Sequence, residues 1–292
     1  MLSVKQRRDG TNMKKWKMLL AATTMTFALA ACNDTATPAN KEVKETTDMT
    51  LEEVYNKSME VSEELKSVSA KVNLHQKMNI PSEEANVELK ADMDMDVVIE
   101  PMQMYQKGTT SMKTEDGSMD ESMETEMYFN GTEFYMYEGT GKQWMKLPTD
   151  ALGDVMAQTN SANPASSLAE LEDYIKDFKF EQDDKNYILT LDASGDKFNE
   201  LVQAQIDETL QSMAQAVEDV QLDVKINSIS YLIHIDKESF QTTKVDVTVD
   251  MDMEAEGESI NMNQDMKTDF SNFNGVEKIE IPQEVIDSAI TI

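Results

Sequence analysis

The chain has 292 residues, with 56 Asp and Glu against 26 Lys and Arg, which gives a formal net charge of −30 at pH 7. This balance excludes a nucleic-acid-binding protein, because phosphates would be repelled, and a protein that lies flat on an anionic membrane through basic residues. The single cysteine allows no disulfide within the chain, so the fold must depend on its apolar core.

The N-terminus carries the pattern of a secretory signal. An apolar run from Met18 to Ala31 follows three lysines, and small residues precede Cys32. The stretch Leu29-Ala30-Ala31-Cys32 resembles the bacterial lipobox, which implies diacylation of the Cys32 thiol and cleavage before it. We therefore predict a signal peptide over residues 1–31 and a lipid on Cys32 that holds the protein at the extracytoplasmic face of the cell membrane. A plain signal peptide with a chance cysteine is the alternative, and translation can start at Met1 or Met13.

The region after Cys32 divides into a linker and one domain. Residues 33–49 are rich in Thr, Asn, Ala and Lys, which predicts a flexible tether over 32–49. The capping box Thr50-Leu51-Glu52-Glu53 predicts a helix from about residue 50 to 66. No later apolar run reaches the ~18 residues that a membrane span needs. We therefore expect a single domain over 50–292 outside the membrane.

Long alternating segments predict strands. Residues 68–80 and 87–99 alternate apolar and polar side chains, so that each strand has one apolar face. Asp116-Gly117 and Asn130-Gly131 are hairpin turn pairs. With residues 102–112, 119–129, 134–137 and 143–147, these segments form a predicted meander of six strands.

The rest of the chain mixes helices with more strands. We predict helices over 150–158, 164–171 and 196–217, the last with one apolar stripe. Further strands are predicted near 178–180, 187–191, 229–235, 245–253 and 260–270. The predicted fold is α+β: a large curved antiparallel sheet of nine to eleven strands, a half-open β-barrel, with helices packed on its concave face. The part of the sheet that the helices leave uncovered would be a groove lined by Met93, Met95, Met251 and Met253.

The 23 methionines allow three interpretations. They can be ordinary core residues. They can line a cavity for a flexible ligand such as an acyl chain, because the unbranched thioether repacks easily. They can also bind copper(I), although no Cys or His cluster accompanies them.

Catalytic and metal-binding patterns are weak. Asp92, Asp94 and Asp96 begin like a calcium loop, but Val97 stands where Gly is needed and Gln103 where Glu is needed. The two histidines, His75 and His234, have no metal-ligand spacing. Ser194 to Lys197 matches Ser-x-x-Lys without the companion motifs. We therefore expect no enzyme, no cofactor and no metal.

The order of lipobox, tether, helix, long meander, helices and long strands is similar to Gram-positive lipoproteins of the LolA/LppX-like superfamily. The residues that carry the resemblance are Tyr128-Phe129-Asn130-Gly131-Thr132, Tyr135 and Trp144-Met145-Lys146. It implies a half-open barrel whose apolar cavity holds lipid or lipidated cargo. We therefore expect a non-enzymatic lipoprotein that binds or carries a lipid or another amphiphile. The alternative is a ligand-free interaction or sensory lipoprotein that docks another envelope protein, with a partner that the sequence does not identify.

Overall fold

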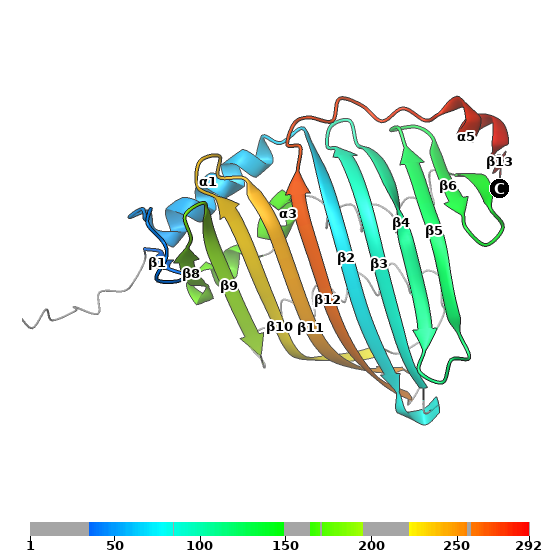
Figure 1. Cartoon of the computed structure of the whole chain (residues 1–292), viewed down its shortest axis with the longest axis horizontal. Helices are drawn as coiled ribbons and strands as arrows, with labels where there is room; N and C mark the ends of the chain where they lie inside the picture. The colour runs from blue at the N-terminus through cyan, green and yellow to red at the C-terminus, as the bar shows by residue number, and fades with distance from the viewer. Residues whose placement is uncertain are drawn as a thin grey trace, which may run out of the picture. The chain divides into compact units, whose positions relative to one another are not determined.

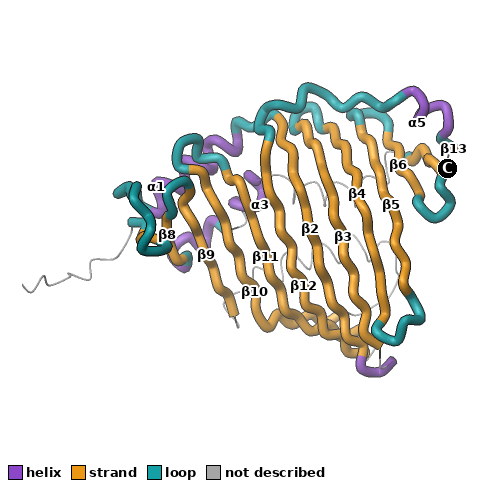
Figure 2. Tube along the Cα trace, viewed as in Figure 1, coloured by secondary structure: helices purple, strands orange, loops and turns teal. Residues whose placement is uncertain are grey.

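The strands of the computed structural model form one sheet (Figures 1 and 2). The structure describes residues 35–83, 85–148, 164–169, 171–194, 222–255 and 258–291. The predicted signal peptide, Cys32 and the predicted helices over 150–158 and 196–217 lie outside these residues. The strands are β1 Thr37–Pro38, β2 Ser67–Ile80, β3 Ala85–Val98, β4 Gln103–Thr114, β5 Asp120–Phe129, β6 Phe134–Glu138, β7 Gln143–Leu147, β8 Lys179–Gln182, β9 Asn186–Ser194, β10 Leu222–Asp236, β11 Thr242–Ala255, β12 Glu258–Ser271 and β13 Ile290–Thr291.

The strand order is β1-β8-β9-β10-β11-β12-β2-β3-β4-β5-β6-β7-β13, and the described sheet is open. All pairs are antiparallel except β1 with β8 and β13 with β7 at the two edges. The predicted fold class is confirmed. The 13 strands exceed the predicted nine to eleven because β1 and β13 have only two residues each. Two residues are too few to show an alternating pattern.

The register separates an apolar from a polar face of the sheet. Val72 of β2 lies opposite Met93 of β3, and the neighbouring pair is Lys71 with Asp94. The Lys71 ammonium lies 3.4 Å from the Asp94 carboxylate, and both side chains are exposed. Such a pair adds little stability. The register therefore follows from the burial of the apolar face.

The first helix, α1 (Leu51–Glu63), begins as its capping box predicts. The Glu53 amide donates to the Thr50 hydroxyl at 3.2 Å, and the Thr50 amide donates to the Glu53 carboxylate at 2.9 Å. Val54 and Tyr55 of this helix are buried. The Tyr55 hydroxyl donates to the carbonyl of Leu168 in α3 (Pro164–Ala169), which ties the two helices together. The other described helices are η1 Pro81–Glu83, η3 Glu172–Asp177 and α5 Gln283–Ser288.

The hydrophobic core lies at one end of the long strands. In β2 the buried residues are at the start of the strand, in β3 at the end and in β4 at the start, and these positions meet in the antiparallel sheet. Val54 and Tyr55 of α1 and Leu168 of α3 belong to the same core cluster as Val68 and Val97. Helices therefore pack on the apolar face as predicted. They do so at the end of the sheet that Figure 1 shows beside α1 and α3.

The segment before α1 differs from the predicted flexible tether over 32–49. From Thr35 on it is bonded to the body of the domain. The buried Gln182 amide donates to the Ala36 carbonyl at 2.7 Å and accepts from the Thr47 amide at 3.0 Å. The Lys44 amide donates to Asp184 at 2.7 Å. These partners are more than 130 residues away, so the local composition could not reveal them.

Candidate functional site

The four methionines of the predicted groove share the apolar face but form two separate pairs. Met93 and Met95 lie opposite Val72 and Ala70 of β2. Met251 lies opposite Met262, which lies opposite Met78 of β2. Val72 and Met78 are six residues apart on the same strand, or roughly 20 Å at 3.3 Å per residue. One groove of ordinary size therefore does not bring the two pairs together.

The first pair belongs to the core end of the sheet. Met95 is 5% exposed and lies in the core cluster. Met93 is half-buried and packs against that cluster, and its sulfur accepts a hydrogen bond from the buried Gln106 amide. These two side chains fit the interpretation of methionine as an ordinary core residue.

The second pair lies beside an apolar surface at the other end of the strands. Nine apolar side chains there are half-buried and stand outside the core cluster. We call this surface the far apolar patch: Leu74, Met78, Ile80, Val87, Leu89, Met112, Met253, Ile260 and Met262. The register makes it continuous, because Met78 lies opposite both Val87 and Met262. Met253 is a member, and Met251 connects the patch to the core.

The far apolar patch offers adaptable apolar contact. Four of its nine members are methionines, whose flexible thioethers repack around irregular partners. The amide of Gln76, on the same face, donates to the Met262 sulfur. Continuous apolar surfaces of this kind mark binding sites. None of the nine side chains can transfer a proton or attack a substrate, so the patch supports binding and no chemistry.

The opposite, polar face holds a pocket of about 490 Å³ near the same ends of β2, β3, β4 and β12. Met78 and Val87 of the far apolar patch also line it, and seven of its eleven lining residues lie at polar-face positions of the register. They include Asn79 and Asn86, whose amides are 2.6 Å apart, and Asn86 in turn donates to Glu115. None of the four predicted methionines lines this pocket.

The remaining predicted residues form no common site. His75 of β2 contacts the Glu88 carboxylate at 2.7 Å, and hydrogen bonds from Lys90 and His75 lower the pKa of Glu88. His234 lies on β10, where burial lowers its pKa. Asp92, Asp94 and Asp96 are bound separately by Asn73, Lys71 and Ser69. Lys197 lies outside the described residues. Within the described ranges, no group of three or more His, Cys, Asp and Glu side chains could hold a metal ion.

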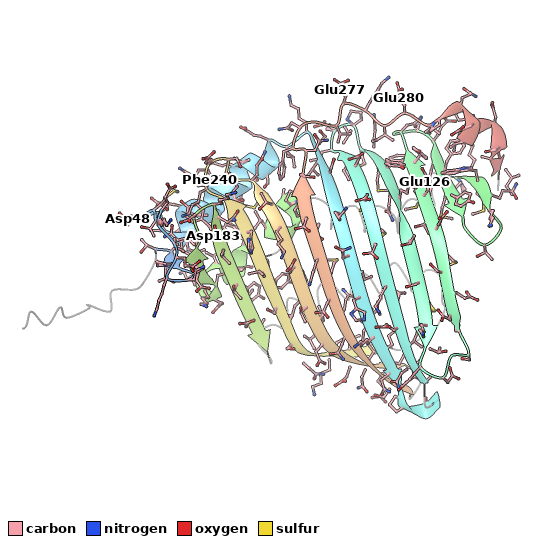
Figure 3. All side chains as sticks on the ribbon, viewed as in Figure 1. Asp48, Glu126, Asp183, Phe240, Glu277 and Glu280 are labelled. Carbon is pink, nitrogen blue, oxygen red and sulfur yellow. The ribbon has the colours of Figure 1, made fainter. Side chains whose placement is uncertain are left out.

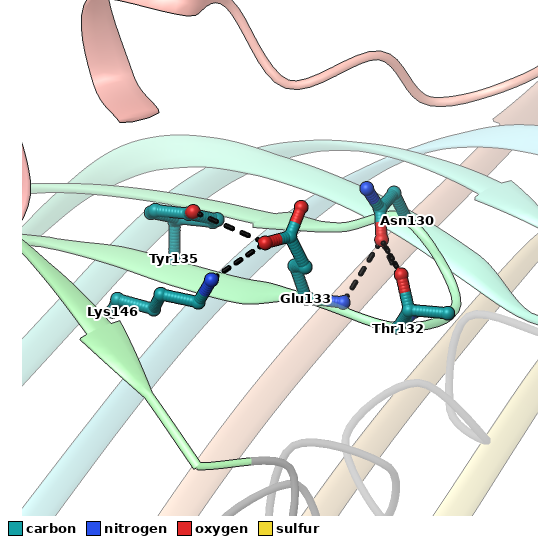
Figure 4. Close-up of polar contacts among 5 residues, drawn as sticks. All are labelled: Asn130, Thr132, Glu133, Tyr135 and Lys146. Atoms are coloured by element: carbon teal, nitrogen blue, oxygen red, sulfur yellow. Dashed lines mark hydrogen bonds and ion pairs between the residues drawn. The ribbon is translucent and has the colours of Figure 1, made fainter. Parts of the chain in front are cut away.

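The β5–β6 hairpin, with the neighbouring strand β7, was not recognised as a candidate site from the sequence. At its turn the Asn130 side chain accepts from the amide of Glu133 at 2.9 Å and from Thr132, and Gly131 has φ 97° (Figure 4). Glu133 then pairs with Lys146 of β7 at 2.5 Å. This hydrogen bond lowers the pKa of Glu133 and raises that of Lys146.

A group of aromatic side chains lies on the polar face beside this hairpin. We call Tyr105, Tyr128, Tyr137 and Trp144 the aromatic row. Ring centroids are 4.7 Å apart for Tyr105 and Tyr128, and 5.7 Å apart for Tyr128 and Trp144. The sequence signal was available: aromatic residues stand at polar-face positions on both sides of Asn130-Gly131. They interrupt an otherwise charged face.

Comparison with known protein families identifies the family of this chain. The profile of the "Family of unknown function (DUF6612)" matches residues 50–290. The chain belongs to this family. A comparison with curated proteins found no match.

Three solved structures show how far the fold likeness extends. The lipoprotein LppX of Mycobacterium tuberculosis is 12% identical, with a TM-score of 0.38, over 79% of this chain and 98% of that chain. A DUF1329 family protein from Desulfovibrio piger is 7% identical, with a TM-score of 0.21, over 76% and 92%. A beta-barrel-like protein of domain of unknown function DUF1849 from Brucella abortus is 8% identical, with a TM-score of 0.19, over 70% and 98%. At these values none of them carries functional information about this chain.

The described helices were also compared with the length and apolar character of a membrane span. Among the helices that the structure describes, none has both the length and the apolar character needed to cross a bilayer.

Proposed function

We propose that this DUF6612 protein is a non-enzymatic binding protein that holds the apolar part of a lipid or another amphiphile on the far apolar patch. The observation that carries the proposal is the patch itself: nine adjoining apolar side chains on one face that are half-buried and outside the core cluster. An ordinary core would bury such residues fully.

The energetics suit a flexible chain. Each methylene removed from water contributes about 0.8 kcal/mol, so ten methylenes contribute roughly 8 kcal/mol before the cost of association. The methionines of the patch can follow a bent chain more easily than β-branched side chains can. Binding therefore needs no polar contact with the ligand.

We propose further that a lipid on Cys32 holds the protein at the outer face of the cell membrane. The proposal is supported by the lipobox-like stretch Leu29 to Cys32 after a basic and apolar leader. Cells labelled with a tagged fatty acid test it. The label should enter the wild-type protein and be lost in Cys32→Ala, and an equal label in both proteins would contradict it.

The binding test uses a neutral dye, N-phenyl-1-naphthylamine, which fluoresces in apolar surroundings and is not repelled by the acidic chain. The dye should bind the wild-type protein and be displaced by a fatty acid. Met262→Glu should weaken dye binding at least tenfold, because the new carboxylate would have to stay solvated within the patch.

The matched control is Met119→Glu, at an exposed methionine outside the strands. It should leave dye binding unchanged. Equal binding by both variants and the wild type would contradict the proposed site, and no binding by the wild type would favour a ligand-free docking lipoprotein.

A further inference from the structure

The aromatic row lies on the polar face of the sheet, where water-exposed carbon is unfavourable. Tyr105, Tyr128, Tyr137 and Trp144 come from four consecutive strands, β4 to β7, and each is half-buried. The Tyr137 and Trp144 rings are 5.4 Å apart, so the contacts run through the whole row. Tyrosine and tryptophan that keep part of a ring in water are typical of binding surfaces.

One carboxylate holds two rings of the row in place. The hydroxyls of Tyr105 and Tyr128 both donate to Oε1 of Glu126 at 3.0 Å, and the Lys107 ammonium lies 3.3 Å from Oε2. Figure 3 labels Glu126 among the side chains over β4 and β5. Burial and Glu126 raise the pKa of both phenols, which stay protonated at neutral pH. Rings fixed before binding lose little entropy when a ligand arrives.

Each of the two lysines that border the row is paired with a carboxylate, and Asp96, opposite Tyr105 on the same face, adds a further negative charge. Lys107 pairs with Glu126, and Lys146 pairs with Glu133. The surface therefore has no free cation for an anionic ligand among these contacts. The charged rim is also unsuited to an acyl chain, because its charges would lose water without gaining partners.

A sugar ring meets these conditions. It presents C–H groups on its flat faces, which pack on aromatic rings, and hydroxyls at its edge, which exchange hydrogen bonds with phenols, carboxylates and ammonium groups. Three inter-strand steps of about 4.8 Å give the row a length of roughly 14 Å, which fits a short oligosaccharide.

We propose that the aromatic row binds a neutral oligosaccharide. Trp144, Tyr137 and Tyr128 supply stacking surfaces, and the Tyr105 hydroxyl, Glu126 and Lys107 bind sugar hydroxyls at the edge of the row. The site lies on the opposite face of the sheet from the far apolar patch, so it does not depend on amphiphile binding.

Tryptophan fluorescence tests this directly, because Trp16 and Trp144 are the only tryptophans in the chain. In the full chain with Trp16→Phe, held in a detergent without sugar groups, Trp144 is the sole tryptophan and is excited at a wavelength that tyrosine does not absorb. The protein is titrated to millimolar concentration with cellotriose, maltotriose and the trimer of N-acetylglucosamine. At least one should change the Trp144 emission saturably and protect it from acrylamide quenching.

Two variants locate the binding. Tyr128→Ala should weaken the affinity roughly tenfold by removing a central ring, whereas Lys113→Ala, on the same face in the polar pocket, should leave it unchanged. If Tyr128→Ala does not fold, Tyr128→Phe is measured in its place. It keeps the ring, so its affinity for the sugar should fall by less than about tenfold. No change in emission or quenching with any of the three sugars, or equal affinity in a folded Tyr128→Ala, would overturn the proposal.

Discussion

The two ends of the apolar face are built alike and used differently. At the core end, Val68 and Met95 are buried in the same cluster as side chains from α1 and α3. At the far end, Met78 and Met262 occupy equivalent alternating positions on neighbouring strands but are half-buried and outside the core cluster. The same pattern of residues thus stabilises the fold at one end and leaves an apolar surface at the other. Whether an apolar face becomes core therefore depends on what packs against it as well as on its own residues.

The largest expected difference between the two ends follows from placing a charge in each. Met95→Asp should destabilise the protein by at least about 4 kcal/mol, because an unpaired carboxylate would be buried in the core. Met262→Asp should cost about 1 kcal/mol, since its carboxylate can reach water. Urea unfolding of both variants measures this. Similar losses would show that the two ends do not differ as described.

A smaller effect is expected from the contact that ties the covering helices together. Tyr55→Phe keeps the ring, which is 1% exposed, but removes the donor to the Leu168 carbonyl. The carbonyl keeps its hydrogen bond from the Leu171 amide at 2.9 Å, so the variant loses one of two hydrogen bonds. The loss should cost up to about 1.5 kcal/mol and lower the urea midpoint. Tyr137→Phe, in the half-buried aromatic row, is the control and should leave the midpoint nearly unchanged. An unshifted midpoint in Tyr55→Phe would mean that this contact does not fasten the core end.

The cap at the start of α1 should contribute less to stability than the Tyr55 contact does. Thr50→Ala removes the side-chain acceptor for the Glu53 amide and should cost about 1 kcal/mol. Glu53→Gln can still reach back to the Thr50 amide and should cost less. Thermal unfolding followed by circular dichroism compares them. A larger loss in Glu53→Gln than in Thr50→Ala would contradict the capping geometry.

The smallest effect concerns pH. Burial lowers the pKa of His234 in the folded protein from 6.5. The unfolded chain therefore binds the proton more readily, and His234 lowers the stability as the pH falls below about 6.5. His234→Gln should therefore lose less stability on acidification than the wild type does, and its stability should change little at alkaline pH. Urea unfolding across this range measures it, and an unaltered pH profile would show that His234 does not contribute.

Local patterns in the sequence predicted much of the fold. Thr50 and Glu53 lie close enough in the chain to define the start of α1, and Asn130-Gly131 fixes the β5–β6 hairpin. Alternation placed Met93 and Met251 on one face, and the register confirms that they share it. These features depend only on neighbours in the chain or on the two-residue period of a strand.

Features that depend on distant partners could not be predicted. Gln182 holds residues 36 and 47 through its amide, although the segment looks like a linker. Alternation also could not show that Met95 lies in the core while Met253 belongs to the far apolar patch, because the period is the same at both ends. The aromatic row depends on the order of β4 to β7 in space, and its members stand on four separate strands.

Native mass spectrometry of the full chain carrying Cys32→Ala would show whether the protein holds an amphiphile, because no covalent lipid obscures the measurement. We expect a noncovalent complex with a co-purifying amphiphile, and a lower occupancy when Met262→Glu is added but not when Met119→Glu is added. A mass equal to the polypeptide alone, together with no uptake of added fatty acid, would contradict it.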